Sequence, residues 1–214
     1  MTRMDILGKL FGSSARVKIM RLFLMNPEDV FEKTEIGKRS KVAGDTLRKE
    51  IKVLEEVGLI KPRVIVKMTQ KKPTTKKPAK DDGLMERKKV SGYGMDPSFP
   101  YLTPLRALVT EIALGKEDVA ARFRNCGQMK LIIVAGIFLD EHASRVDVLL
   151  VGDKLKKPII EGVLRRLEAE LGKELTYGIM ETPDFEYRFG IYDKFIRDII
   201  DFPHLVVLNK LNLF

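Results

Sequence analysis

The side chains best suited to chemistry in this chain are lysines and arginines, and they gather in one short segment. The 214 residues carry a formal net charge of +9. Residues 60–90 hold 11 basic and 3 acidic residues, whereas residues 1–59 hold 12 and 9, and residues 91–214 hold 16 and 18. Cations concentrated in this way neutralise the phosphates of nucleic acid. The alternative interpretation is a solvated, lysine-rich linker.

A second set of polar side chains precedes that segment at helical spacing. Leu47, Ile51 and Leu54 recur every three or four residues and predict the buried stripe of a helix over residues 44–57. Side chains off the stripe would reach base edges and phosphates if the N-terminal half of this helix entered a major groove. The alternative is an ordinary solvated helix face. The candidate DNA-binding residues here are Thr46, Arg48, Lys49 and Lys52.

Two further helices and a tight turn are expected to hold that helix in place. The first has a broad apolar face and is stopped by Asn26-Pro27. In the second, Gly37 permits close approach of a neighbouring helix. A turn over residues 40–43 then leads to the basic helix, which Gly58 ends, and this order is typical of a helix-turn-helix. The expected N-caps are Ser13 or Ser14 for the first helix and Thr34 for the second, which runs through Arg39.

The cationic segment itself has the pattern of a β-hairpin. Residues 60–67 predict a strand and residues 87–94 its return strand. The tip between them is rich in Lys, Thr and Pro, cannot build a core, and is expected to be mobile over residues 69–86. The whole wing, about residues 61–95, would contact DNA in the minor groove or along the backbone. Its candidate DNA-binding residues are Arg63, Lys67, Lys71, Lys72, Lys76, Lys77, Arg87 and Lys88.

One stretch of this region carries a family pattern. The sequence Thr34-Glu35-Ile36-Gly37 and residues 46–60, which close with Leu-Glu-Glu-Val-Gly-Leu-Ile, resemble the arsenic-repressor-like winged-helix regulators. The resemblance covers about residues 12–95 and implies a winged helix that often forms a homodimer. The chain lacks that family's Cys-x-Cys metal-sensing pair, and its histidines are His142 and His204, so we expect no bound metal.

The rest of the chain predicts a small α/β domain behind a connector. Residues 99–128 are expected to supply helices 105–114 and 116–124, the first of which packs on the N-terminal domain or forms a dimer interface. From residue 129, apolar strands alternate with helices, which is typical of a sheet covered by helices. The expected strands are 130–136, 145–151, 174–180 and 205–208, and the expected helices are 158–171 and 193–200. The chain is therefore expected to be α+β, with domains 1–98 and 129–214 joined by 99–128.

The first two strands of that domain end or begin with residues that could bind phosphate. Gly136 follows the first strand, and Asp147 lies two residues after Arg145 on the second. This pattern resembles the polymerase-beta superfamily of nucleotidyltransferases, especially its minimal members, over about residues 129–210. The family places Gly-Ser after the first strand to bind the triphosphate and Asp-x-Asp on the second to hold two magnesium ions. Here Ile137 replaces the serine, and Arg145 replaces the first aspartate.

An arginine at a metal-ligand position opposes the binding of divalent cations. At roughly 4 Å and an effective dielectric constant near 20, each unit-charge interaction is worth about 4 kcal/mol, so we expect no two-metal catalysis, no catalytic residue and no cofactor. One alternative is an active enzyme in which Asp147 pairs with Asp140, Asp153 or Glu174. Another is nucleotide binding without chemistry at Gly136, Arg145 and Asp147, with Arg145 as the phosphate partner.

These patterns together predict a sequence-specific transcriptional regulator that binds double-stranded DNA. Its C-terminal domain is expected to be a pseudoenzyme that serves as a sensor, a dimerisation module or a docking surface. The alternative is an active nucleotidyltransferase that the winged helix targets to nucleic acid. A single cysteine, Cys126, the lack of a signal-peptide pattern and the lack of a membrane-length apolar run predict a cytoplasmic protein without a membrane partner. Besides double-stranded DNA, the expected partners are a second copy of the chain and a nucleotide ligand.

Overall fold

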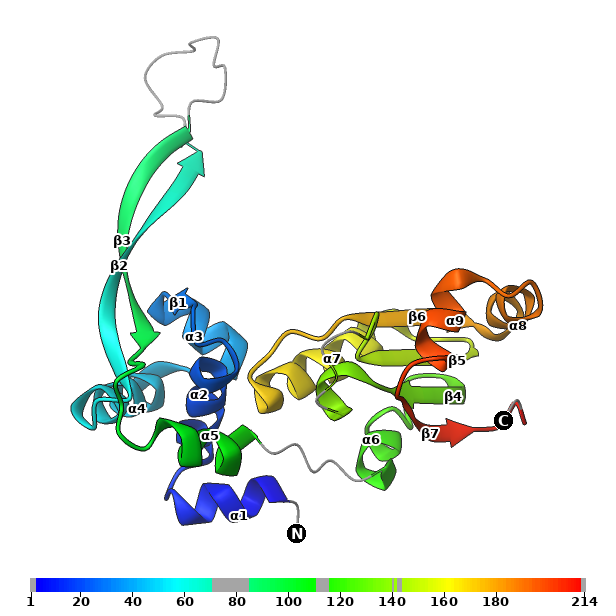
Figure 1. Ribbon diagram of the computed structural model, residues 1–214, viewed down its shortest axis with the longest axis horizontal. Coiled ribbons are helices and arrows are strands. Elements are labelled where there is room, and N and C mark those ends of the chain that lie inside the picture. The colour runs from blue at the N-terminus through cyan, green and yellow to red at the C-terminus, as the bar shows by residue number, and fades with distance from the viewer. Residues whose placement is uncertain (1–2, 71–84, 111–115, 140, 142–143, 213–214) are drawn as a thin grey trace.

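In the computed structural model, the described part of the chain comprises residues 3–70, 85–110, 116–139, 141 and 144–212. It is a mixed α+β structure, with an N-terminal unit on the left of Figure 1 and a four-stranded sheet covered by helices on the right. Within these residues, no helix is both long and apolar enough to cross a membrane. The elements of the N-terminal unit are α1 (Arg3–Leu10), α2 (Ser14–Met25), β1 (Val30–Phe31), α3 (Lys33–Ser40), α4 (Gly44–Glu56), β2 (Ile60–Gln70), β3 (Met85–Met95) and α5 (Leu102–Thr110).

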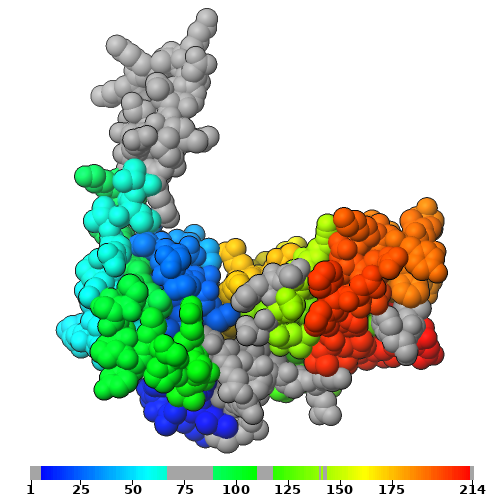
Figure 2. Space-filling model, in the orientation of Figure 1, coloured from blue at the N-terminus to red at the C-terminus, as the bar shows by residue number. Residues whose placement is uncertain are grey.

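A three-stranded antiparallel sheet in the order β1-β3-β2 lies beside the N-terminal helices. Strands β2 and β3 pair without interruption from Ile60↔Met95 to Gln70↔Met85. Each residue advances a strand by about 3.4 Å, so this hairpin is much longer than the two residues of β1 that pair with it. Figure 2 shows its cyan and green strands projecting from the rest of the N-terminal unit.

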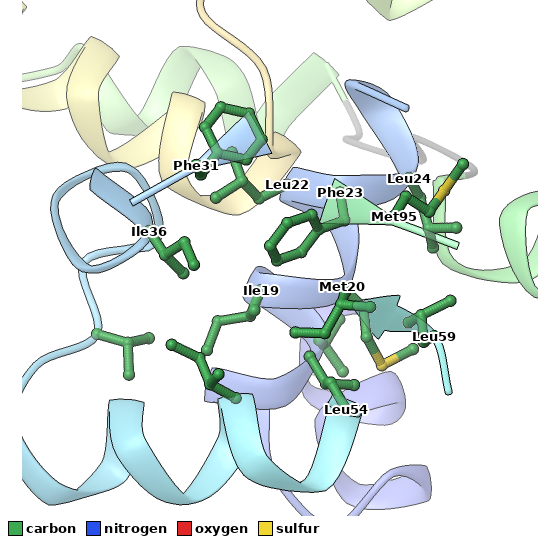
Figure 3. Close-up of a cluster of buried hydrophobic side chains, with 14 of the residues drawn as sticks. Ile19, Met20, Leu22, Phe23, Leu24, Phe31, Ile36, Leu54, Leu59 and Met95 are labelled. Atoms are coloured by element: carbon green, nitrogen blue, oxygen red, sulfur yellow. The ribbon is translucent and has the colours of Figure 1, made fainter. Parts of the chain in front are cut away.

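Helix α2 lies at the centre of the N-terminal core. Ile19, Phe23 and Leu24 on α2 are completely buried, and the Phe23 ring meets the Phe31 ring edge-on at 5.6 Å. In Figure 3, side chains from α2, α3, α4 and the sheet converge on this cluster. The described part of α5 also packs here, since Val109 is completely buried. This part of α5 therefore lies against the N-terminal unit, which is one of the two roles expected for it.

The helix ends agree with the sequence in two of three cases. The Ser13 side chain accepts a hydrogen bond from the Arg16 N–H at 3.2 Å, which confirms the expected cap of α2. Gly58 follows α4 with a positive φ of 81°, as expected of the residue that ends a helix. The expected cap at Thr34 is wrong, because α3 begins at Lys33 and Thr34 lies inside it. The capping position is Glu32, whose side chain makes no capping bond.

The C-terminal unit is a four-stranded sheet with helices on both faces. The strand order is β6-β5-β4-β7, in which β5 and β6 are parallel and the other two pairs are antiparallel. The elements are α6 (Lys116–Arg122), β4 (Gln128–Val134), η1 (Gly136–Leu139), β5 (Val148–Asp153), α7 (Lys157–Leu171), β6 (Tyr177–Glu181), α8 (Thr182–Gly190), α9 (Lys194–Ile200) and β7 (Leu205–Asn209).

Side chains on the central strands alternate between two separate apolar layers. Ile132 on β4 packs in the layer under α6 and α7, whereas Leu131 and Ile133 pack in the layer under α8 and α9. All three are completely buried. A strand enclosed on both faces needs an unbroken apolar run, and this is the pattern that predicted it.

Several expected boundaries in this unit are wrong. Strand β4 spans Gln128–Val134 and not 130–136, because η1 begins at Gly136. Strand β5 begins at Val148 and not at residue 145, although the backbone of Asp147 just before it already bonds to Ala135 and Thr176. It continues through Gly152, since this glycine pairs with Met129 and leaves no room for a Cβ. Strand β6 begins at Tyr177 and not at residue 174. Helix α8, which directly follows β6, was not expected from the sequence.

Candidate nucleic-acid interface

Helix α4 presents a polar face opposite its buried stripe. Leu47, Ile51 and Leu54 are at most 7% exposed, as the helical spacing predicts. The Arg48 side chain contacts Asp45, and Lys52 Nζ lies 3.7 Å from Glu56 Oε1. Exposed pairs of this kind are worth at most about 1 kcal/mol, so both cations can exchange their partners for phosphates. The four expected contact residues of this helix are all exposed: Thr46, Arg48, Lys49 and Lys52.

A buried ion pair fixes the orientation of α4. Glu50 is 4% exposed, and its Oε2 lies 2.8 Å from Arg16 Nε on α2. The same guanidinium donates from Nη1 to the Phe11 carbonyl oxygen at 2.9 Å. On the other side, a Cβ on Gly37 would lie 3.0 Å from the Leu47 side chain, which confirms the close helix approach expected at this glycine. Helix α4 is thus held by both α2 and α3.

The base of the hairpin carries cations opposite glycines. Lys61 pairs with Gly94 and Arg63 pairs with Gly92 across the two strands. Because directly opposed residues share a face of the sheet, these long side chains meet no side chain across the ladder. Lys61 and Arg63 are both exposed. The hairpin therefore presents positive charge next to α4, with which β2 is in contact.

One of these cations is engaged by the protein itself. Lys61 Nζ lies 2.6 Å from Asp96 Oδ2, and Ser98 donates to Asp96 Oδ1 from its hydroxyl at 2.8 Å and its amide at 3.1 Å. The bonds from Lys61 and Ser98 lower the pKa of Asp96 to about 2. This carboxylate therefore stays ionised and ties the base of the hairpin to the segment that follows it. Arg63 lies two residue pairs further along the hairpin and is also exposed.

Seven other expected contact residues fall wholly or partly beyond the described structure. Lys71, Lys72, Lys76 and Lys77 lie outside the described residues. The expected tip, 69–86, is too long at both ends, because residues 69 and 70 pair with residues 86 and 85 in the hairpin. For the remaining three, the backbone pairing alone is described, with Lys67 opposite Lys88 and Met68 opposite Arg87. The predictions at these positions remain predictions.

The candidate phosphate residues of the C-terminal unit are brought together in part. Gly136 has a φ of +54°, and a Cβ at this position would lie 2.2 Å from Asp147 Oδ1. That oxygen accepts a hydrogen bond from the Ile137 N–H at 2.9 Å, and Asp147 Oδ2 accepts one from the Thr176 N–H at 2.8 Å. The Asp147 carboxylate thus joins the end of β4 to the segment before β6.

Arg145 makes a different contact. Its Nε lies 3.3 Å from Asp198 Oδ2 on α9, and its side chain is 45% exposed. Arg145 and Asp147, which we expected on the second strand of this unit, both precede β5. An exposed guanidinium with one carboxylate partner can still bind a phosphate if its contact with that carboxylate breaks.

The carboxylates that would have to replace the missing aspartate are dispersed. Asp153 lies at the far end of β5 from Asp147 and is 3.9 Å from Lys130. Glu174 is 3.0 Å from Arg39 of the N-terminal unit. Asp140 lies outside the described residues. Within the part of the chain that the structure describes, no three His, Cys, Asp or Glu side chains are grouped closely enough to hold a metal ion.

The residues that join the two units were missed by sequence reasoning. Arg21 on α2 is 6% exposed and donates to the carbonyl oxygens of Val109 at 2.6 Å and Glu170 at 2.9 Å. Burial lowers the pKa of this guanidinium and the nearby Glu170 raises it. Asn26 donates to the Gly172 carbonyl oxygen at 2.7 Å. The sequence did contain one indication of this contact, because Arg21 lies within the apolar face of α2.

Comparisons of the chain with protein-family models, with curated proteins and with solved structures find no match.

Proposed function

We propose that the chain is a sequence-specific DNA-binding regulator whose N-terminal unit is a winged helix-turn-helix. The order α2-β1-α3-α4-β2-β3 and the antiparallel sheet β1-β3-β2 support this assignment. In it, α3 and α4 are the helix-turn-helix, α4 enters the major groove, and the β2–β3 hairpin is the wing that contacts the adjacent backbone. The partner is double-stranded DNA.

The observation that carries the proposal is the two-sided character of α4. Its apolar stripe is buried against the core, its opposite face presents Thr46, Arg48 and Lys49 to solvent, and the cationic hairpin follows directly. An arginine or lysine on such a face can make bidentate bonds to guanine, and a threonine can contact a base edge or a methyl group. The buried Arg16–Glu50 pair supports this function because it keeps the helix in one orientation.

The C-terminal unit is, in this proposal, a module without catalysis that acts as a sensor, a dimerisation element or a docking surface. Both carboxylate oxygens of Asp147 accept backbone hydrogen bonds, which suits a residue that stabilises a turn. Arg145 carries a positive charge at the sequence position where the family has a metal-ligating aspartate, and its present partner is Asp198. A magnesium-dependent incorporation assay with labelled ATP tests the point, and turnover that disappears in Asp147→Ala would overturn it.

The main test is a salt titration of binding to genomic DNA fragments by the full chain and by Arg48→Ala/Lys52→Ala. We expect one enriched fragment that survives near-physiological salt, and loss of that enrichment in the double variant with its fold intact. Uniform binding that vanishes as salt rises would mean that the cations are a generic nucleic-acid handle. The matched control is Lys194→Ala/Arg197→Ala on α9, which removes the same charge from an exposed helix of the other unit.

A further inference from the structure

A cavity of about 160 Å³ lies between the two units, at the C-terminal ends of α3 and α7. Leu22 of α2 forms part of its apolar wall. In Figure 2 the yellow surface of α7 lies beside the blue surface of the N-terminal unit. The cations that line the cavity are Lys38, Arg39 and Lys41 from α3 and its end, and Arg165 and Lys173 from α7 and its end.

The two carboxylates of this cavity are already engaged within the protein. Glu168 Oε1 accepts a hydrogen bond from the Leu175 N–H at 3.1 Å. Glu174 Oε1 lies 3.0 Å from Arg39 Nη2, and this pair joins the N-terminal unit to the C-terminal unit. Both arginines of the lining are also paired, since Arg39 Nε lies 3.3 Å from Glu35 Oε1 and Arg165 Nη1 lies 3.5 Å from Glu161 Oε2. The other cations of the lining are three lysines, Lys38, Lys41 and Lys173.

The C-terminal ends of α3 and α7 help to hold these lysines at the cavity. The C-terminus of a helix carries about half a negative charge, and cations in its last turn stabilise it. Two such ends, those of α3 and α7, supply about one unit of negative charge together. The ammonium groups of the three lysines are therefore the cations with which an anion in the cavity would pair.

The volume of the cavity and the residues that line it limit the class of ligand that can bind there. A cavity of about 150 Å³ lined by apolar side chains holds a benzene molecule, and this one is slightly larger and opens to solvent between cationic side chains. Leu22 and the aliphatic stems of the lysines favour an apolar body. We propose that this junction pocket binds a small organic anion, a carboxylate or phosphate group on an apolar body no larger than a six-membered ring.

The position of the junction pocket gives such a ligand a route to the DNA-binding face. Lys41 lies in the turn between α3 and α4, and Lys173 follows α7. A ligand held by both would strengthen or weaken the contact that the Arg39–Glu174 pair makes between the units. A regulator needs such a differential contact, because a ligand shifts an equilibrium only through unequal affinity for its two states. This second step rests on the proposed function, whereas binding itself does not.

The test is calorimetry of the full chain, without DNA, against benzoate, phenyl phosphate, inorganic phosphate and benzyl alcohol. We expect benzoate or phenyl phosphate to bind at least about tenfold more tightly than inorganic phosphate, which lacks the apolar body, and benzyl alcohol, which lacks the charge. Lys41→Glu and Lys173→Glu should each weaken the bound anion at least about tenfold. Lys194→Glu, on the exposed face of α9, should leave it unchanged.

Several results would overturn the assignment. One is a lack of binding by both aromatic anions. Another is unchanged affinity in Lys41→Glu and Lys173→Glu when circular dichroism shows both folded. If a glutamate variant does not fold, Lys173→Gln replaces it and should still weaken binding, since it removes the positive charge without adding a negative one.

A DNA titration with and without the bound anion separates the two proposals. A change in DNA affinity that is lost in Lys173→Glu supports regulation through the junction pocket. Anion binding by a chain that binds no DNA would leave the pocket standing and overturn the proposed function. If the chain binds DNA but neither aromatic anion, the proposed function stands and the junction pocket is overturned.

Discussion

Arg16 Nε lies 2.8 Å from Glu50 Oε2, and this contact joins the start of α2 to the middle of α4. The Glu50 side chain is 6% exposed and that of Arg16 is 26% exposed. A carboxylate buried to this degree is stabilised only while its cation is present. The exposed face of α4 and the core beneath α2 are therefore linked by one pair of charges, and the orientation of the candidate DNA-binding helix depends on it.

We expect Glu50→Ala to lower the free energy of unfolding by about 2 kcal/mol, because it leaves a half-buried guanidinium without its partner. The value is below that of a fully buried pair, since Arg16 keeps contact with solvent and with the Phe11 carbonyl. Urea unfolding at neutral pH measures it. The control is Glu56→Ala, which removes the exposed partner of Lys52 and should change stability by no more than about 0.5 kcal/mol. Equal losses of unfolding free energy in Glu50→Ala and Glu56→Ala would contradict the stabilising role of the Arg16–Glu50 pair.

The lowered pKa of Asp96 predicts an acid-sensitive contribution to stability. Bonds from Lys61 and Ser98 hold this pKa at about 2 in the folded protein, below the ordinary value of 3.8. The contribution is therefore fully present above about pH 4 and is lost as the pH falls through 2. Urea unfolding at pH 5, 3 and 2 should show a smaller loss of stability in Asp96→Asn than in the native protein. Identical pH dependence in the two proteins would rule this contact out as the cause.

A third prediction concerns two glycines in different surroundings. Gly136→Ala would place a methyl group against Asp147 Oδ1 at a residue whose φ is +54°. It should lower the free energy of unfolding by about 2–4 kcal/mol, from backbone strain and from the disturbed hydrogen bonds of Asp147. Gly162→Ala lies within α7, where a Cβ meets no atom within 4 Å, and should raise stability by about 0.5–1 kcal/mol. Thermal unfolding of both variants checks the difference, and destabilisation by Gly162→Ala would show that the helix is crowded there.

The elements that the sequence predicted best are those with a regular apolar period. The stripe of Leu47, Ile51 and Leu54 and the double-sided burial of Leu131 to Val134 both follow from residue type and spacing alone. Element ends were predicted less well, because they depend on single hydrogen bonds. Asp147 looked like part of a strand, but its backbone N–H bonds to the Thr176 carbonyl oxygen and its carboxylate turns toward Gly136.

The remaining differences come from contacts that no local pattern contains. Strand β1 is two residues long and forms because β3 offers Tyr93 and Gly94 as partners. Helix α8 was missed because Thr182–Gly190 mixes polar and aromatic residues, and Phe185 is its one completely buried side chain. The junction pocket draws its cations from two stretches more than a hundred residues apart in sequence. Only the folded chain brings them together.

The contact between Arg21 and the C-terminal unit gives the last prediction. Its guanidinium is buried between α2, α5 and α7 and satisfies the carbonyl oxygens of Val109 and Glu170. Arg21→Ala would leave both without this donor, and each buried oxygen that loses its partner costs about 1–3 kcal/mol. We expect a loss of about 2–4 kcal/mol and, because the bond to Glu170 joins the two units, a separation of one unfolding transition into two. Calorimetry resolves the transitions. Arg166→Ala, on the exposed side of α7, should keep a single transition, and a single transition in Arg21→Ala as well would mean that other contacts couple the units.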